Sequence, residues 1–354
     1  MWRKAYEIVL SKKEEIRAFL RAHLDEKTRV ILTGAGTSAY IGDTLEVALS
    51  REIRSIRAVP TTDIITDPGA WFSAEDKVLL VSFARSGNSP ESVGAVNAVS
   101  KTAGEVAHIF ITCNENGHLA KMEGPDILTI LLPPETNDLS LAMTSSYSTM
   151  LLVFSMIARI DSLEADREAV YMLAEKVEAS LSREEARIGE IAGRSFSRAV
   201  FLGSGPLKGV AEECRLKLQE LTDGAVMCAY DSFLGFRHGP KALVNPDSLM
   251  VYLLSPDPAV RRYELDLIRQ VRSNNSVKAS IIVCASKEGI ENEECDLCIE
   301  THLPADMPQC YSCLAYVIVG QLLGFYKSIA CGLCPDSPSV SGNISRVVEG
   351  VTLY

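Results

Sequence analysis

Three short loops in the first half of the chain are rich in side chains that donate hydrogen bonds. The first contains Gly36-Thr37-Ser38, the second reads SFARSGNSPES from Ser82, and the third reads MTSSYST from Met143. Helix N-termini bind anions through backbone N–H groups, and serine and threonine hydroxyls add further donors. The loops therefore predict a site for the phosphate group of a small molecule. Ordinary helix N-caps use the same residue types, so each loop taken alone is ambiguous.

The predicted phosphate ligands are Gly36, Thr37, Ser38, Ser86, Gly87, Asn88, Ser89, Thr144 and Ser145. Nucleotide-binding motifs do not match these loops. A Walker loop would need GK[ST], and GAGTSA lacks the third glycine of a dinucleotide fingerprint. We therefore expect a small phosphorylated molecule and no cofactor.

The second half of the chain offers groups that can move protons. In GVAEECRLKLQELTDG, which predicts a helix, the spacing of Glu213, Lys217 and Glu220 places all three on one face. Further on, FRHGPKAL places His238 before Gly-Pro at a predicted helix start, and histidine titrates near neutrality. Simpler interpretations are a solvated row of ion pairs on the helix and a structural or exposed histidine.

The elements that must position these residues occur twice. RVILTGAGTS from Arg29 is matched by RAVFLGSGPL from Arg198, about 170 residues later, which indicates a duplicated domain. In each copy, short apolar runs alternate with amphipathic stretches of helical length. This alternation predicts an α/β fold with two tandem domains, each a doubly wound, mainly parallel five-stranded sheet flanked by helices. Strands are expected at 30–33, 56–59, 78–83, 108–112 and 127–131, and at 199–202, 226–229, 249–253, 280–284 and 297–300.

The serine-rich loop is present in only one of the two copies. Where the first copy reads SFARSGNSPES, the second reads LLSPDPAVRR. A hydroxyl-rich turn that one copy lacks is not required by the fold, so it is expected to serve a ligand. Ligands of such sheets bind at the carboxyl ends of the strands, where this loop and GAGTSAY are both expected.

Charge and hydropathy restrict the partners. The 354 residues carry a formal charge of −11, which argues against nucleic-acid and membrane surfaces because both are polyanions. No run is expected to span a bilayer, since CLAYVIVGQLLGF is interrupted by Gly320 and Gln321. The charged, amphipathic N-terminus is unlike a secretory signal, so we expect a cytoplasmic protein with reduced cysteines.

The ten cysteines include three CxxC pairs. Cys295/Cys298 and Cys310/Cys313 together read C-x2-C-x11-C-x2-C, which is near the spacing of a zinc ribbon. A strand in DLCIE and a buried helix in CYSCLAYVIVGQLL are the favoured explanation, because cysteine also behaves as a small hydrophobe. We therefore expect no metal site.

In this order, the motifs resemble the sugar isomerase (SIS) domain proteins over nearly the whole chain. The similarity is closest to the galactosamine-6-phosphate deaminase/isomerase family, also called tagatose-6-phosphate ketose/aldose isomerases. It is carried by LTGAGTSAYIGD, SFARSGNSPESV, AMTSSYST, YDSFLGFRHGPKALV and SGNISRVVEGV. The resemblance implies an N-terminal helix in 1–26, a phosphate-binding SIS domain in 27–165, a second SIS domain with the acid/base residues in 185–332, and a tail in 333–354.

The resemblance also implies catalytic roles. His238 matches the ring-opening histidine of a relative, and Glu220 matches the carboxylate that moves a proton between C2 and C1 of the sugar. Lys217 would stabilise charge on the enediol or enolamine oxygen. Water would then release ammonia from an imine at C2, so galactosamine 6-phosphate would become tagatose 6-phosphate.

Two arginines depart from a related synthase. Arg346 stands where the synthase has a lysine near the sugar, and we expect it to bind the substrate. An arginine keeps its proton and cannot form an imine. Arg85 stands where the synthase has glutamine, and it either adds charge to the phosphate pocket, which we favour, or faces solvent. The family implies a homodimer or higher homo-oligomer with the site at the interface. An isomerase that releases no ammonia and a non-catalytic sugar-phosphate sensor are the alternatives.

Overall fold

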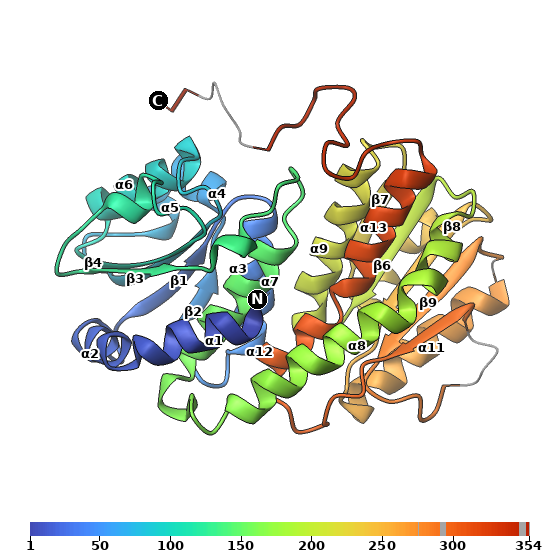
Figure 1. Ribbon diagram of the computed structural model, residues 1–354, viewed down its shortest axis with the longest axis horizontal. Helices are drawn as coiled ribbons and strands as arrows, with labels where there is room; N and C mark the ends of the chain where they lie inside the picture. The colour runs from blue at the N-terminus through green and yellow to red at the C-terminus, as the bar shows by residue number, and fades with distance from the viewer. Residues whose placement is uncertain (275, 291–294, 347–351, 354) are drawn as a thin grey trace. The chain divides into compact units, whose positions relative to one another are not determined.

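The computed structural model describes residues 1–274, 276–290, 295–346 and 352–353, which form two compact units (Figure 1). The first unit comprises Met1–Leu139, Met143–Tyr171 and Arg346–Tyr354. The second unit comprises Ser140–Ala142 and Met172–Ser345. Each unit is built on one five-stranded sheet.

The sheet of the first unit is parallel throughout, in the order β2-β1-β3-β4-β5. Its central strands are almost continuously buried and apolar, because helices cover both faces of the sheet. The strands are β1 (Arg29–Thr33), β2 (Ile56–Ala58), β3 (Lys77–Ala84), β4 (Glu105–Thr112) and β5 (Ile127–Leu131).

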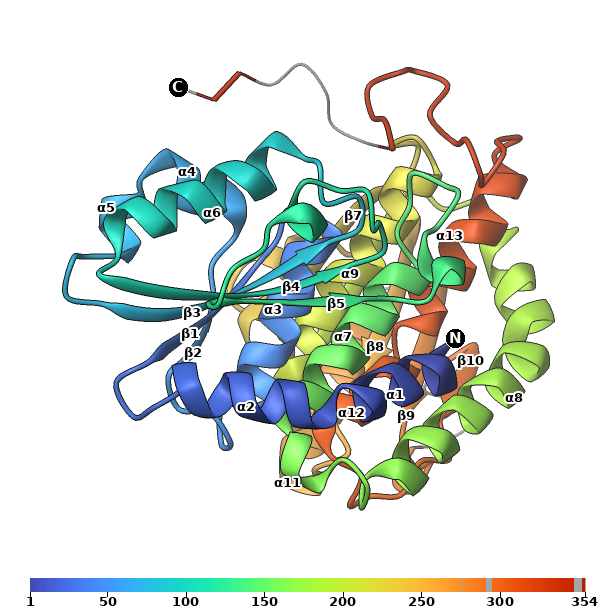
Figure 2. The same ribbon diagram turned by 60° about the vertical axis from the view of Figure 1, so that its left-hand side comes forward.

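Helices of the first unit form a layer on each face of its sheet. Figure 2 shows α4, α5 and α6 on one face, and α1, α2, α3 and α7 on the other. The first layer packs on a buried apolar cluster that includes Ile31, Leu80 and Phe110. The helices are α1 (Trp2–Ser11), α2 (Lys13–His23), α3 (Thr37–Ala48), α4 (Thr61–Thr66), α5 (Pro68–Trp71), α6 (Pro90–Thr102) and α7 (Ser145–Ala158), with the 3-10 turns η1 (Leu119–Lys121), η2 (Pro134–Thr136) and η3 (Ile160–Ser162).

The sheet of the second unit repeats this topology in the order β10-β9-β8-β6-β7, again with all strands parallel. Its strands are β6 (Arg198–Gly203), β7 (Met227–Asp231), β8 (Ser248–Leu253), β9 (Ala279–Cys284) and β10 (Leu297–Glu300). Its helices are α8 (Arg167–Ala192, which begins in the first unit), α9 (Pro206–Leu221), α10 (Phe233–Phe236), α11 (Pro258–Asn274), α12 (Gln309–Ser312) and α13 (Ile318–Ala330), with the 3-10 turns η4 (Pro240–Leu243) and η5 (Cys313–Ala315).

Close packing of α9 against α13 fixes the helix that carries the predicted acid/base residues. A Cβ on Gly320 would lie 2.5 Å from the Cα of Cys214, and one on Gly324 would lie 2.8 Å from the carbonyl oxygen of Lys217. These glycines therefore let the two helix backbones approach each other. On the other side of the sheet, α10 and α11 cover an apolar cluster that includes Phe233, Phe236 and residues of β6, β8 and β9.

The predicted fold class is confirmed. All ten expected strands are present, and their ends differ from the expected ones by at most three residues. In each sheet the strand order reverses beside the first strand of the unit, between β1 and β3 and between β6 and β8. Loops at the carboxyl ends of such a pair form the crevice where open parallel sheets bind ligands.

One expectation about membranes needs correction. The segment Gln309–Ala330 is long and apolar enough to cross a bilayer by length and composition, although the sequence pattern was expected to exclude this. Its apolar window is 61% buried inside the unit. The apolar character of the segment is explained by packing on α9, as in the core helix of a globular domain.

Candidate active site

The loop after β1 turns tightly into α3. Gly36 has a positive φ of 54°, a conformation that favours glycine. A Cβ on Gly34 would lie 2.6 Å from the backbone carbonyl carbon of Ser38, so a larger residue does not fit. Thr37 and Ser38 open the helix and are buried. The predicted donors of the first loop therefore lie at a helix N-terminus beside the point where the strand order reverses.

The serine-rich loop follows β3, the neighbour of β1, and leads into α6. Ser89 is the N-cap of α6, and its Oγ accepts a hydrogen bond from the backbone N–H of Ser92 at 3.2 Å. Gly87 has a positive φ of 64°. Ser86 Oγ accepts a bond from the backbone N–H of Asn88 at 3.3 Å. One hydroxyl of this loop is thus a helix cap, and the case for an anion site depends on the loop's position and on its arginine.

The segment after β4 supports the serine-rich loop. Asn114 Nδ2 donates to the carbonyl oxygen of Ser86 at 2.8 Å. The backbone N–H of His118 donates to Asn88 Oδ1 at 2.9 Å. Asn88 therefore supports the loop through its side-chain oxygen, a role that the sequence pattern did not predict.

The third loop presents its donors to a carboxylate of the protein. Asp138 accepts from the hydroxyl of Thr144 at 2.9 Å and from the backbone N–H groups of Thr144, Ser145 and Ser146 at 2.9 to 3.1 Å. Burial would raise the pKa of Asp138, but hydrogen bonds from Ser146, Ser145 and Thr144 bring it below the ordinary aspartate value. In this structure, Thr144 and Ser145 therefore direct these donors at Asp138 rather than at an open anion site.

Two arginines lie beside these loops. Arg85 is buried, with 7% of its surface exposed, so the alternative that it faces solvent is wrong. Its Nη2 donates to the carbonyl oxygen of Arg346 at 2.6 Å. The guanidinium of Arg346 donates to the carbonyl oxygen of Asp138 at 2.7 and 3.0 Å and to Asn137 Oδ1 at 2.8 Å. The first unit thus holds two positive charges near the hydroxyl-rich loops, where a phosphate would need them.

The face of α9 that was singled out from sequence is buried. Lys217 Nζ lies 3.2 Å from Glu213 Oε1 and also pairs with Glu220. The side chains of Lys217 and Glu213 have no exposed surface, whereas that of Glu220 is 15% exposed. The alternative of a solvated row of ion pairs is therefore wrong. Glu220 is the member of this cluster that a small molecule can reach.

Lys217 stays charged despite its burial. Burial by itself lowers the pKa of Lys217, but the carboxylates of Glu213 and Glu220 raise it above the ordinary lysine value. A fixed cation beside a carboxylate can stabilise negative charge on a substrate oxygen while the carboxylate exchanges a proton. The cluster is therefore suited to acid/base chemistry next to an oxyanion.

His238 lies in the second unit, in the turn between α10 and η4. It is exposed, and the residue after it, Gly239, has a positive φ of 128°. Neither a hydrogen bond nor an ion pair joins His238 to Glu220 in the part of the chain that the structure describes. The structure thus groups Glu220 with Lys217 in the second unit and the loop residues with both arginines in the first.

One functional candidate was missed from sequence. Asp138 precedes Thr144 by six residues, and an acidic residue shortly before a hydroxyl-rich helix start is the signal that could have found it. Glu213 was placed on the correct face of α9, but its burial depends on α13, which lies about 100 residues later. Among the described residues, no group of three or more His, Cys, Asp and Glu side chains could hold a metal ion.

The family model of the SIS domain matches residues 23–160 and 194–325 of this chain. The D-galactosamine-6-phosphate deaminase AgaS of Shewanella sp. (strain ANA-3) is 36% identical, and the match covers 100% of this chain and 89% of that protein.

Two crystal structures are similar over the whole chain. The crystal structure of a protein from Clostridium novyi NT has a TM-score of 0.96 and 34% sequence identity, and the match covers 100% of this chain and 92% of that chain. The tagatose-6-phosphate ketose/aldose isomerase from Escherichia coli has a TM-score of 0.89 and 33% identity, with 100% of this chain and 93% of that chain covered.

Proposed function

Because this chain belongs to the SIS domain family, we propose that it is an enzyme that converts galactosamine 6-phosphate to tagatose 6-phosphate and ammonia. The similarity of its whole length to a D-galactosamine-6-phosphate deaminase supports this substrate. The observation that carries the proposal is the α9 cluster, in which buried Lys217 holds Glu220 at partial exposure. A protein that only sensed sugar phosphates would not need this acid/base group.

The first unit binds the phosphate in this proposal. The loops after β1 and β3 lie at neighbouring strand ends, and they supply Thr37, Ser38, Ser86 and Ser89. Arg85 adds a charge beside them. Bidentate pairing with arginine is a strong way to hold a phosphate. Thr144 and Ser145 join this set only if Asp138 moves away from the start of α7.

The second unit moves the protons. In the open-chain sugar, Glu220 takes the proton from C2 and returns one to C1, while Lys217 stabilises the oxygen that becomes negative. The nitrogen on C2 is then an imine. Water adds to this carbon and ammonia leaves, which gives the ketone of tagatose 6-phosphate. His238 exchanges the protons of ring opening, for which imidazole is suited near neutral pH.

A homodimer or higher homo-oligomer belongs to this proposal, with His238 acting on the active site of a neighbouring subunit. Mixing a His238→Ala chain with a Glu220→Gln chain tests this directly. If the site is shared, mixed dimers contain one site with both native residues, and about a quarter of the native activity returns. A mixture that stays inactive although mixed dimers form would contradict the shared site.

Ammonia release tests the reaction itself. We expect release from galactosamine 6-phosphate, measured in a coupled assay beside glucosamine 6-phosphate. Glu220→Gln should abolish turnover and leave binding intact. Glu212→Gln is the matched control, because Glu212 lies on the same helix and pairs with Arg215 instead. If both sugars bind and neither gives ammonia, the proposed deaminase activity is wrong.

The alternative reaction is aldose–ketose isomerisation without loss of ammonia. The tagatose-6-phosphate ketose/aldose isomerase from Escherichia coli, which is similar over the whole chain, favours it. It needs the same proton transfer between C1 and C2 and the same Glu220. Interconversion of tagatose 6-phosphate with its aldose, without any nitrogen in the substrate, would identify this activity.

A further inference from the structure

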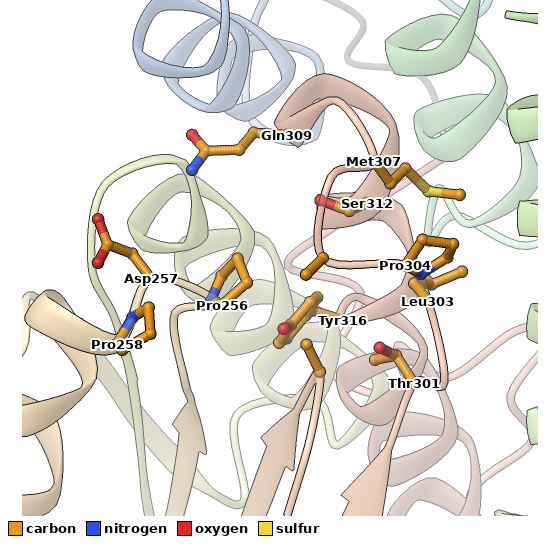
Figure 3. A pocket seen from close by; sticks show the side chains of 12 residues that line it. Pro256, Asp257, Pro258, Thr301, Leu303, Pro304, Met307, Gln309, Ser312 and Tyr316 are labelled. Atoms are coloured by element: carbon orange, nitrogen blue, oxygen red, sulfur yellow. The ribbon is translucent and has the colours of Figure 1, made fainter. Parts of the chain in front are cut away.

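The second unit contains a pocket at the carboxyl ends of its own strands (Figure 3). It has a volume of about 300 Å³ and is formed by the segments that follow β8, β9 and β10 together with α12 and Tyr316, the residue after η5. A smaller pocket of about 20 Å³ adjoins it at the loop after β6. The smaller pocket lies where the strand order of the second sheet reverses, between β6 and β8, and the larger one extends from the loop after β8 toward β10.

Buried polar groups of this pocket lack partners. Tyr316 and Thr301 line it and are buried, with 2% and 5% of their surfaces exposed. Among the described residues, neither hydroxyl has a hydrogen-bond partner. A buried hydroxyl without a partner is unfavourable, so a native protein keeps one mainly where something else satisfies it. Figure 3 shows Gln309, Ser312, Tyr316 and Thr301 following one another along one wall, opposite the loop that carries Asp257.

A buried carboxylate is bonded to the lining of the adjoining pocket. Glu264 is fully buried, and its Oε2 accepts a bond from the backbone N–H of Ser255 at 2.8 Å. Its Oε1 has no hydrogen-bond partner among the described residues. Ser255 lines the adjoining pocket. Burial raises the pKa of Glu264, while hydrogen bonds from Ser204 and from the backbone of Ser255, which both line this pocket, lower it in part.

The charged side chains around the pocket are Asp257 in its lining and Arg261 of α11 at its edge, where Arg261 Nε donates to the carbonyl oxygen of Ser255 at 3.1 Å. The lining residues include no Lys, Arg or His, but they include Asp257. Asp76 precedes β3, and Asp247 precedes β8 at the corresponding position of the second copy. Asp257 follows Asp247 at the same spacing at which Ser86 follows Asp76, so Asp257 corresponds to Ser86. Asp257 Oδ1 also accepts the backbone N–H of Ala259 at the start of α11 at 2.8 Å. A carboxylate of the protein therefore occupies the position where a helix N-terminus would bind a phosphate.

We propose that this pocket binds an amino sugar that carries no phosphate. Hydroxyls of such a sugar satisfy the unpaired hydroxyls of Tyr316 and Thr301 and bond to Ser312 and Gln309, and the ammonium group faces Asp257. The volume suits one monosaccharide, at the lower end of the range for small-molecule pockets. The pocket uses none of the residues assigned to the proposed reaction, so this site stands or fails independently of that reaction.

Binding is tested with galactosamine and calorimetry on the full chain. The Ser86→Ala/Glu220→Gln protein is used, so that the proposed active site converts no substrate and contributes less to the measured heat of binding. We expect galactosamine to bind, and Tyr316→Phe or Thr301→Val to weaken binding about tenfold. Tyr326→Phe removes a hydroxyl outside the pocket and should change nothing. No binding of galactosamine, or equal binding by the Tyr316→Phe protein, would overturn the proposal.

Two comparisons fix the chemical class of the ligand. The binding that Tyr316→Phe removes should be weaker for galactosamine 6-phosphate than for galactosamine, because Asp257 repels the phosphate; this difference excludes any binding of the phosphorylated sugar that remains at the first unit. Galactose should also bind more weakly, and Asp257→Asn should remove the difference between galactose and galactosamine. Tighter binding of the phosphorylated sugar, or no preference for the amine, would contradict an amino-sugar site.

The stability and the activity of Tyr316→Phe show whether the pocket is independent of the proposed reaction. Tyr316→Phe keeps the ring and removes only an unpaired hydroxyl, so its thermal midpoint without ligand should be equal to or above that of the native protein. In an otherwise native chain, this variant should release ammonia at the native rate. A Tyr316→Phe protein that unfolds more easily without ligand would show that the hydroxyl has a structural partner, which contradicts its assignment to a ligand.

Discussion

Removal of the buried cation on α9 gives the sharpest test of the catalytic cluster. Lys217→Met keeps most of the side-chain volume and deletes the charge that lies 3.2 Å from Glu213. Glu213 has no exposed surface, so its carboxylate would be left in the interior without its cation. Loss of one partner from a buried ion pair destabilises a protein by about 3–5 kcal/mol.

A second substitution shows whether loss of the Glu213–Lys217 pair causes the loss of stability in Lys217→Met. Glu213→Gln alone leaves Lys217 paired with Glu220, so it should be milder than Lys217→Met. Glu213→Gln/Lys217→Met has no charge left without a partner at these two positions, and it should recover at least about 2 kcal/mol of the loss. The difference between the single and double substitutions measures the coupling.

Urea denaturation at pH 7, followed by circular dichroism, measures these free energies through the transition midpoint and slope. Glu220→Gln is the control, because Glu220 is partly exposed and should affect stability less than Lys217→Met. If Lys217→Met costs less than about 1 kcal/mol, which is typical of an exposed pair, the cluster is solvated and the argument for a buried acid/base group fails.

Three further predictions concern the loops and a buried carboxyl group. Ser86→Ala should weaken binding of galactosamine 6-phosphate in calorimetry far more than binding of galactosamine, and equal losses would remove Ser86 from the phosphate site. Asp138→Asn should lower the thermal midpoint, with a loss of about 1–2 kcal/mol, because it weakens the cap of α7; an unchanged midpoint would contradict this role. Burial raises the pKa of Glu264 to about 7, so its contribution to stability is fully present below about 4.5 and is lost as pH rises through 7. Glu264→Gln should remove that part of the decline in urea midpoint between pH 5 and pH 8, and an identical pH profile would refute it.

Local patterns predicted the sheets well because buried parallel strands are recognisable from short apolar runs. They also identified the loops after β1 and β3, since glycine and hydroxyl residues at strand ends are local signals. Contacts between distant parts of the chain were not predictable in this way. The bond from Arg85 to Arg346 spans 261 positions, and nothing near Arg85 in the sequence indicates it. Similarly, Thr144 has the composition of a ligand, but Asp138 already accepts its hydroxyl.

The duplicated fold separates what the sheet requires from what each ligand requires. Both units reverse their strand order at the same place, so both create a crevice at the carboxyl ends of their strands. The first unit places hydroxyls and the buried Arg85 there, whereas the second places Asp257 and unpaired hydroxyls. The backbone topology is the same, so the difference lies in the loops. Buried hydroxyls without partners are unfavourable unless something satisfies them, and those of Tyr316 and Thr301 line the pocket of the second unit. The proposed second ligand supplies these partners, and this is what the Tyr316→Phe and Thr301→Val variants test.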